Sequence, residues 1–351
     1  MKHTSTYAEE IRNALFHEMK ADESLIIMGL GVNDPKGVFG TTTGLSKEFG
    51  KDRVIETPTS ENAMLGVGIG LAIKGHKVVS VHQRLDFFLL ALDQLINAAS
   101  KWDYMFGGQT PVPITIRLIL GRGWGQGPTH SQNLHAFFAH TPGLRVVMPA
   151  LAAEAGKLLS SSINSKSPVI FLEDRWLHFQ EVGKFSDEKI PIGKHSVVRE
   201  GKDCTIIASG FMLIEALRVA STLSEIGIST NIVDLRTLKP LDMNFLEGEV
   251  RRTSRVVIVD SGPAFANFGK EIAYQLNETL HGILAHPPIV VSARDAHEPT
   301  SHGVIYEFKV SALDISKAVF KVLDLSPDER VITKLILSRT DVPYEGFKGP
   351  F

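Results

Sequence analysis

Residues 53–72 read RVIETPTSENAMLGVGIGLA, and this stretch decides the fold. The apolar run that begins at Val54 indicates a short strand, and Pro58 and Ser60 indicate a turn after it. The residues from Glu61 onward are small and apolar, which predicts a closely packed helix with Ser60 as its N-cap. A strand followed by a turn and a helix is the repeating unit of an α/β protein.

Glu61 stands in the first turn of this predicted helix. A carboxylate at that position complements the helix dipole, which stabilises a helix by a few tenths to about 1 kcal/mol. The alternative is a functional carboxylate, held where a strand ends and surrounded by glycine and alanine. The residues that follow along the chain favour the functional interpretation.

The composition limits the class of protein. The chain has 351 residues, of which 43% are hydrophobic and 22% charged, with a net charge of -2. That length suggests two domains. The near-neutral charge argues against binding to nucleic acid or to a membrane surface. No apolar run reaches the length of a membrane span, and no secretory signal is recognised at the start. Cys204 is the single cysteine, which excludes a disulfide within one chain and fits a cytoplasmic protein.

Helical and apolar segments alternate along the first half of the chain, which predicts an α/β fold with a mainly parallel sheet. We expect helices at residues 7–20, 61–74, 87–104 and 154–164, with a short helix from His130, and strands at 25–28, 77–81, 113–119, 146–148 and 169–172.

A second alternation follows a polar stretch at residues 178–202. The expected strands are 204–208, 229–233, 255–259 and 288–291, and the expected helices are 212–226, 243–252, 268–279 and 311–323. We therefore predict one domain at residues 1–185 and a second at 186–325. Residues 326–351 are expected to form an irregular tail.

A glycine-rich loop, GRGWGQG at residues 121–127, follows the strand that ends near Leu120 and leads into PTHSQ. Loops at the carboxyl ends of parallel strands form the binding crevice of an open α/β sheet. Glycine lets the backbone approach a ligand closely, although a flexible loop is the alternative. His130 is either a structural histidine or a proton donor, because imidazole exchanges its proton near neutral pH.

Four polar side chains gather where the strand at 77–81 ends: His82, Gln83, Arg84 and Asp86. Such groups need hydrogen-bond partners within the protein or from a ligand. The structural alternative is a local pair between Arg84 and Asp86, of little consequence for stability if exposed. Residue type alone favours core positions for Phe87 and the phenylalanine after it.

Ordered motifs run from the first helix to about residue 324. They are FGTTTGL (39–45), RVIETPTSEN (53–62), ALDQLINAASK (91–101), YMFGGQ (104–109), THSQ (129–132), PGLRVVMP (142–149), PVIFLE (168–173) and DLRTLKPLD (234–242). In these motifs the chain resembles the β subunits of thiamine-diphosphate-dependent E1 components of 2-oxo acid dehydrogenase complexes. The resemblance implies a pyrimidine-binding domain followed by a transketolase-like C-terminal domain.

The same resemblance implies a partner chain. In this family an α chain holds the diphosphate and Mg²⁺ by a Gly-Asp-Gly signature, and the present sequence contains no Gly-Asp-Gly. We expect no metal ligands from this chain itself, and an α2β2 heterotetramer that includes β–β contacts. An E2 partner that carries a lipoyl group is the acyl acceptor that the family implies.

Site residues follow from the matched motifs. Glu61 matches the glutamate that hydrogen-bonds the aminopyrimidine ring of the cofactor, and Phe87 matches an aromatic residue that packs against that ring. Gln83 is expected to contact the cofactor as well. His130 matches an active-site histidine near the reacting carbons, suited to proton transfer.

The sequence also departs from the family pattern. Unusual residues stand at 29–32, 82–84 and 173–178, and Ser165 replaces an acidic residue near the monovalent-cation site, which argues against potassium binding. His82, Arg84 and Arg175 are therefore candidates for contacts to an unusual substrate, since arginine recognises carboxylates and phosphates.

Three functions remain open from the sequence. The first is an E1 β subunit, for decarboxylation of a 2-oxo acid and acyl transfer to a lipoyl group. The second is a transketolase-like or acyloin-forming carboligase subunit of specialised or polysaccharide metabolism. The third is a non-catalytic scaffolding subunit, against which the retention of Glu61, Phe87 and His130 argues.

Overall fold

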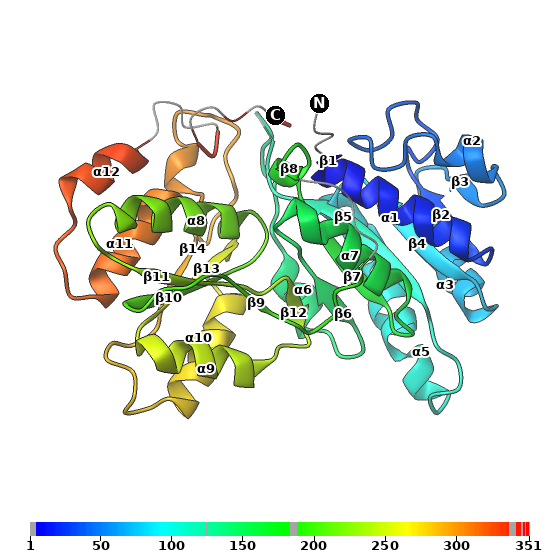
Figure 1. The fold of residues 1–351 in the computed structure, drawn as a ribbon. Helices are drawn as coiled ribbons and strands as arrows, with labels where there is room; N and C mark the ends of the chain where they lie inside the picture. Colours follow the sequence, from blue (N-terminus) through cyan, green and yellow to red (C-terminus); the bar gives the residue numbers. More distant parts are fainter. Residues whose placement is uncertain are drawn as a thin grey trace.

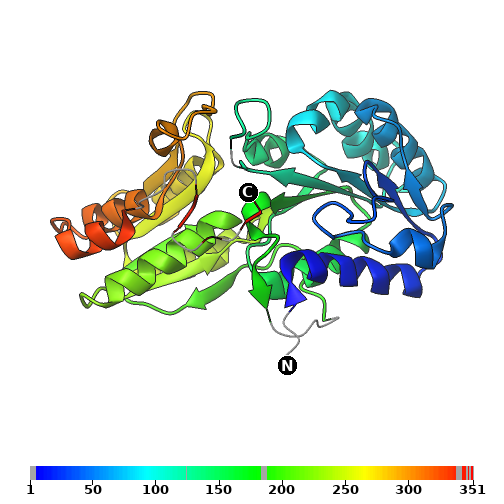
Figure 2. The ribbon, with the colours of Figure 1, turned by 90° about the horizontal axis from the view of Figure 1, so that it is seen from above.

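The computed structural model describes residues 5–123, 125–182, 188–336, 342–344, 347, 349 and 350. Two α/β domains lie side by side, each built around its own mainly parallel sheet (Figures 1 and 2). This confirms the predicted fold class. No helix in the described part of the chain is both long and apolar enough for a membrane span.

The first sheet has seven strands in the order β12-β6-β7-β5-β4-β2-β3. Its strands are β2 (Leu25–Gly29), β3 (Val54–Glu56), β4 (Lys77–His82), β5 (Ile114–Leu120), β6 (Arg145–Val147), β7 (Val169–Asp174) and β12 (Thr237–Lys239). All neighbours are parallel except β12, which pairs antiparallel with β6. Strand β12 comes from the second half of the chain, so the two domains share this sheet.

The second sheet has five strands in the order β14-β13-β10-β11-β9. They are β9 (Ser196–Arg199), β10 (Cys204–Ala208), β11 (Thr230–Asp234), β13 (Val256–Pro263) and β14 (Ile289–Ala293). Strand β9 is the antiparallel member. A further short pair joins β1 (Ser5–Thr6) to β8 (Glu181–Val182).

Helices cover both sheets. In the first half they are α1 (Tyr7–Ala21), α2 (Leu45–Phe49), α3 (Glu61–Ile73), α4 (Leu85–Phe88), η1 (Leu89–Ala91), η2 (Gln94–Ala99), α5 (Ser100–Met105), α6 (His135–His140), α7 (Ala152–Ile163) and η3 (Arg175–Leu177). In the second half they are α8 (Phe211–Ser224), α9 (Met243–Thr253), α10 (Phe268–Thr279), η4 (Ile305–Glu307), α11 (Ala312–Val322) and α12 (Glu329–Leu335).

Alternate residues of strand β4 enter two different apolar clusters. Val79 and Val81 pack with α1 and α7, whereas Val78 packs on the opposite face with α3. This two-sided burial explains why the strands of the first sheet read as nearly continuous apolar runs.

Helix α3 packs very closely on this sheet. A Cβ atom on its Gly68 would lie 3.0 Å from Cδ1 of Ile114, so a larger side chain there would require the Ile114 methyl group to shift. Ser60 occupies the N-cap position as predicted, but its side chain makes no capping hydrogen bond.

The predicted helix at residues 87–104 is helical throughout, from Leu85 to Met105, but it is not one regular α-helix. The segment consists of α4, the 3₁₀ turn η1, the π-helical η2 and α5. Its buried side chains, Leu85, Phe88, Ala91, Leu95 and Ala99, are spaced first by three residues and then by four. The turns tighten and widen accordingly, which keeps one face of the segment in the core.

Two further predictions are corrected. The helix expected from His130 begins only at His135, because the preceding residues form turns that bind other loops. The tail expected to be irregular contains α12, whose N-cap Asp328 accepts a hydrogen bond from the backbone N–H of Arg330. Only two residues of α12, Val331 and Leu335, are buried, which is too few to reveal a helix by periodicity.

A buried ion network joins the central strands β5 and β7. Arg117 donates from Nε and Nη2 to the two carboxylate oxygens of Glu173, at 2.6 and 2.8 Å. The ring of His178 lies 3.2 Å from the same carboxylate and packs against Tyr7. Burial alone would raise the pKa of Glu173, but Arg117 and the His178 hydrogen bond lower it to about 2.

We expect Glu173→Gln to lower the free energy of unfolding by about 3–5 kcal/mol at neutral pH, because Arg117 would remain charged and buried without its partner. Urea denaturation measures this. Glu200→Gln, which breaks an exposed pair with Arg252, should cost less than about 1 kcal/mol. Equal losses in the two variants would contradict the assignment.

The same pair predicts a pH dependence. The folded pKa of Glu173 lies below its ordinary value of 4.5, so its contribution is present above pH 4.5 and is lost as pH falls towards about 2. The stability difference between the wild type and Glu173→Gln should shrink across that interval.

Candidate active site

The predicted site residues lie on one edge of the first sheet. Strands β2, β3, β4, β5 and β7 are parallel and in register, so their carboxyl ends point the same way. Helix α3 follows β3, residues 83–88 follow β4, the glycine-rich loop follows β5, and Arg175 follows β7. The fold thus collects segments that are far apart in the sequence at one crevice.

Glu61 is the first residue of α3 and is only 7% exposed. Within the residues that the structure describes, its carboxylate has no hydrogen bond or ion pair. The carboxylate can therefore accept a hydrogen bond from an N–H donor of a bound molecule.

Phe87 and His130 come from different loops and meet edge to face, with ring centroids 5.2 Å apart. The Phe87 ring is 42% exposed, so it remains open to stacking with a ligand. His130 Nδ1 lies 3.0 Å from the hydroxyl of Thr129, which orients the imidazole.

Gln83 lies against the loop after β2. Gly31 adopts a φ of +73°, and a Cβ atom there would lie 2.8 Å from Nε2 of Gln83, so the position requires glycine. Glu56 accepts hydrogen bonds from the backbone N–H groups of Gly31 and Asn33, at 2.7 and 2.9 Å. Sequence reasoning missed Glu56, although a polar residue that ends a strand is a detectable signal.

His82 is buried in the core rather than open to the crevice. Its Nε2 lies 2.9 Å from the Ser80 hydroxyl, and its ring packs on Phe88. Burial lowers the pKa of His82 to about 3, so the imidazole is neutral at physiological pH. This position opposes a direct contact between His82 and a substrate.

Arg84 forms hydrogen bonds that hold the glycine-rich loop in place. Its Nη1 donates to the carbonyl of Gly121 at 2.9 Å, and its Nη2 donates to Gln126. The local pair with Asp86 is not formed, because the Asp86 carboxylate instead accepts from the backbone and side chain of Gln132, at 3.2 and 3.0 Å. Burial, and next the charge of Arg175, lower the pKa of Arg84 to about 10.

Arg175 approaches the same loop from the side of β7. Its guanidinium lies over the Phe39 ring at 4.9 Å. A Cβ atom on Gly123 would lie only 2.7 Å from its Nε, so this glycine makes room for the arginine. Burial lowers the pKa of Arg175. Two arginines therefore flank the loop that carries His130.

The second domain also holds this loop. Arg122 forms an ion pair with Glu298 at 2.9 Å, and Gly127 packs directly on the Thr300 side chain. Just after the loop, His135 pairs with Asp260 at 2.8 Å. Burial alone would lower the pKa of His135, yet the Asp260 carboxylate raises it overall. Sequence reasoning did not predict these contacts of Asp260 and Glu298, because both residues lie far from the loop in the sequence.

Both domains match known family models. Residues 3–178 match the family described as "Transketolase, pyrimidine binding domain", and residues 193–315 match "Transketolase, C-terminal domain". Among solved structures, "Split gene transketolase, inactive beta4 tetramer" superposes with a TM-score of 0.74 over 92% of this chain and 99% of that one. Its sequence identity is 22%, so this likeness supports the fold alone.

Curated relatives share more of the sequence. The pyruvate dehydrogenase E1 component subunit beta of Staphylococcus epidermidis is 38% identical over 296 residues, 84% of this chain and 91% of that protein. The subunit of the same name from Rhizobium meliloti is also 38% identical, and the chain spans 65% of its length. Acetoin:2,6-dichlorophenolindophenol oxidoreductase subunit beta of Cupriavidus necator is 38% identical over 78% of this chain and 84% of that protein.

The contact between Gly127 and Thr300 can be tested by a double-mutant cycle. Gly127→Ala would force the Thr300 hydroxyl away, and we expect a loss of about 1–3 kcal/mol in the free energy of unfolding. Adding Thr300→Ala should restore at least half of that loss, measured by chemical denaturation. Gly248→Ala in α9, where a Cβ meets nothing within 4 Å, serves as the control and should not destabilise. Additive effects at the two positions would contradict the packing.

Proposed function

Because the chain belongs to the family of pyruvate dehydrogenase E1 β subunits, with transketolase-type pyrimidine-binding and C-terminal domains, we propose that it is the β subunit of an enzyme that decarboxylates a 2-oxo acid. One observation carries the proposal. Glu61 is a buried carboxylate without a partner in the described chain, on the same sheet edge as the exposed Phe87 ring and His130.

These residues fit thiamine diphosphate. Glu61 is only 7% exposed and offers a carboxylate without a partner in the described chain, and Phe87 offers an aromatic face. The bound cofactor supplies the carbanion chemistry. In our proposal the Glu61 carboxylate holds a proton at the aminopyrimidine ring, where burial strengthens the hydrogen bond, while Phe87 packs against the ring. Gln83 borders the same crevice and is proposed as a further contact.

His130 is proposed to move a proton at the reacting carbons. It is carried by the loop that Arg84, Arg175 and Glu298 hold in place, so its position is defined from both domains. A general acid or base must lie within hydrogen-bond reach of its target, and a well-held loop meets that requirement.

A partner α chain is proposed to hold the diphosphate and Mg²⁺. The absence of Gly-Asp-Gly from the sequence supports this division. Exposed apolar side chains on the first domain support subunit contacts, including contacts between β chains: Val67 is 57%, Leu90 66% and Tyr104 90% exposed. The proposed assembly is an α2β2 heterotetramer that transfers its acyl group to a lipoyl-bearing E2.

A second candidate is a carboligase subunit that uses the same carbanion without lipoate. The similarity to the acetoin oxidoreductase β subunit supports this second candidate. A neighbouring gene for a lipoyl-domain E2 would support acyl transfer to lipoate. An α-chain gene without such an E2 gene would support the carboligase.

Glu61→Gln is expected to retain assembly with the α chain and to lose about 10²-fold or more in turnover, because the amide cannot hold the proton. The chain would be co-expressed with the adjacent Gly-Asp-Gly chain and assayed with thiamine diphosphate, Mg²⁺, a panel of 2-oxo acids and a dye acceptor. Glu48→Gln, an exposed glutamate in the first turn of α2, is the matched control. Full activity of the Glu61 variant would refute the assignment.

Arg84 and Arg175 are proposed to favour an anionic group on the substrate. Arg175→Ala and Arg84→Ala should each raise KM about tenfold or more, and Arg175→Lys should recover only part of the loss, since lysine lacks the planar fork. Arg251→Ala on α9, exposed and remote from the crevice, should leave KM unchanged. An unchanged KM in both alanine variants would remove this role.

A further inference from the structure

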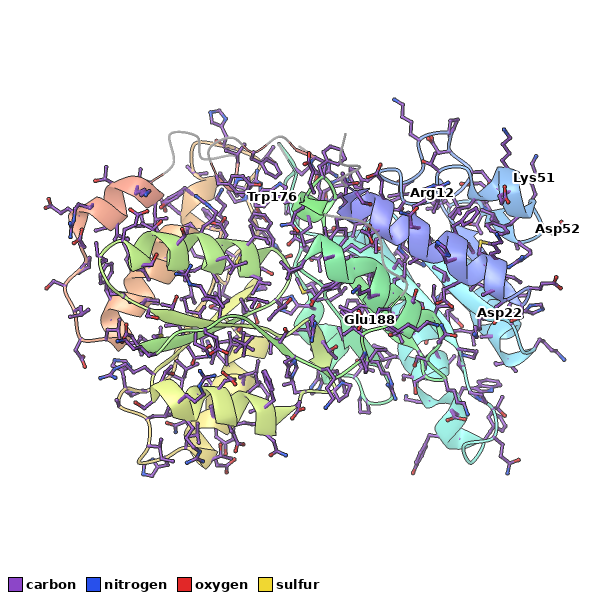
Figure 3. The ribbon with its side chains drawn as sticks, in the orientation of Figure 1. Arg12, Asp22, Lys51, Asp52, Trp176 and Glu188 are labelled. Carbon is purple, nitrogen blue, oxygen red and sulfur yellow. The ribbon has the colours of Figure 1, made fainter. Side chains whose placement is uncertain are left out.

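The described residues of the segment 342–347 pack on both domains. The Phe347 ring meets Trp176 of the first domain edge to face, with ring centroids 5.9 Å apart. The Tyr344 ring stacks parallel to Phe211 of the second domain, at 6.5 Å. Trp176, labelled in Figure 3, is seen where the two halves of the molecule meet. The match to the C-terminal family model ends at residue 315, so this segment is additional to the matched domains.

The aromatic rings of this contact form one closed cluster. Trp176 also meets Phe211 edge to face, at 5.2 Å. Tyr344 meets Phe347 in the same way, at 5.5 Å, so that each of these rings contacts two others. Edge-to-face aromatic contacts stabilise a fold beyond the area that they bury. Because Val342 and Phe347 are only 2% and 8% exposed, the segment packs as part of the core and not as a surface tail.

Two cations of the second domain hold the backbone of the same segment. Lys309 Nζ donates to the carbonyl of Val342 at 3.0 Å. Arg218 Nη1 donates to the carbonyl of Pro343 at 3.2 Å, and its guanidinium lies over the Tyr344 ring at 5.0 Å. Hydrogen bonds from charged donors are stronger than neutral ones, and a cation over a ring face adds attraction. Two successive carbonyls of the segment are therefore bound to the second domain.

Trp176 belongs to η3, the 3₁₀ turn that also carries Arg175. On one side of this turn Arg175 passes beside Gly123 of the glycine-rich loop, and on the other side Trp176 reaches the ring cluster. The Asp174 carboxylate accepts hydrogen bonds from the backbone N–H groups of Trp176, at 3.1 Å, and of Phe211. Neighbouring residues of one tight turn cannot move independently, so the place of Trp176 determines where the Arg175 backbone lies.

We propose that residues 342–347 act as an interdomain strap: through Trp176 they hold the η3 turn, and with it Arg175, against the glycine-rich loop. Phe347 is then a positioning residue for the active site, although it lies beyond the matched family domains. The consequence for substrate binding rests on the role proposed above for Arg175, whereas the strap itself does not.

Hydrogen exchange of the purified full chain tests the strap without an assay of activity. In the wild type the N–H of Trp176 donates to Asp174, and the N–H of His178 donates to the carbonyl of Arg175 at 3.4 Å. Phe347→Ala should speed the exchange of these two amides about tenfold or more, because the turn loses its support and opens locally. Exchange within helix α1 should remain unchanged.

Further variants make the result specific. Phe347→Leu keeps apolar volume and should speed exchange less than Phe347→Ala does. Lys309→Met removes the hydrogen bond to Val342 and should act in the same direction as Phe347→Ala. Tyr274→Ala removes an aromatic ring of α10 that is 63% exposed, and it should change nothing. Unchanged exchange in Phe347→Ala, or equal acceleration in α1, would overturn the strap.

The catalytic consequence is measured separately, in the enzyme assembled with the proposed α chain. Phe347→Ala should raise KM about threefold or more and leave kcat nearly unchanged, since a displaced Arg175 weakens substrate binding and not the chemical step. In an Arg175→Ala background the same change should add nothing, because the arginine that the strap positions is gone. Faster exchange with an unchanged KM would retain the strap and remove the role proposed for Arg175, so the two failures are distinguishable.

Discussion

The bidentate ion pair between Arg117 and Glu173 lies at the centre of the first sheet, and the site geometry depends on it. It joins β5 to β7, and these two strands deliver the glycine-rich loop and Arg175 to the crevice. His178 extends the network to Tyr7 on α1. Since removal of one partner would leave a buried charge, the pair holds the two strand ends in one arrangement.

From these strand ends the support continues outward to the loop that carries His130. Arg84 binds the loop at Gly121, Asp86 binds it at Gln132, and Glu298 of the second domain binds it at Arg122. The first domain contributes the residues proposed for chemistry. The second domain determines where part of that loop can lie, so the two domains act as one support for the active site.

Local patterns predicted most of the secondary structure. The alternation of apolar runs and helices identified two α/β domains, and the glycines after Glu61 predicted the close packing of α3. The failures arose where tertiary contacts override local preference. The segment after Phe87 changes its helical pitch to keep one face buried, and the turns around His130 bind Asp86 and delay the next helix to His135. Strand β12 joins a sheet built by the other domain, which no local pattern can reveal.

The sequence by itself determined the fold class and most of the helices and strands, because apolar periodicity is a property of neighbouring residues. The resemblance of its ordered motifs to a known family added the candidate residues Glu61, Phe87 and His130. Only the tertiary structure decided which polar groups pair. His82 is buried, and Arg84 hydrogen-bonds the glycine-rich loop rather than Asp86. Arg122 pairs with Glu298, which lies 176 residues further along the chain. Such partners are chosen by desolvation and distance, and both exist only once the chain has folded.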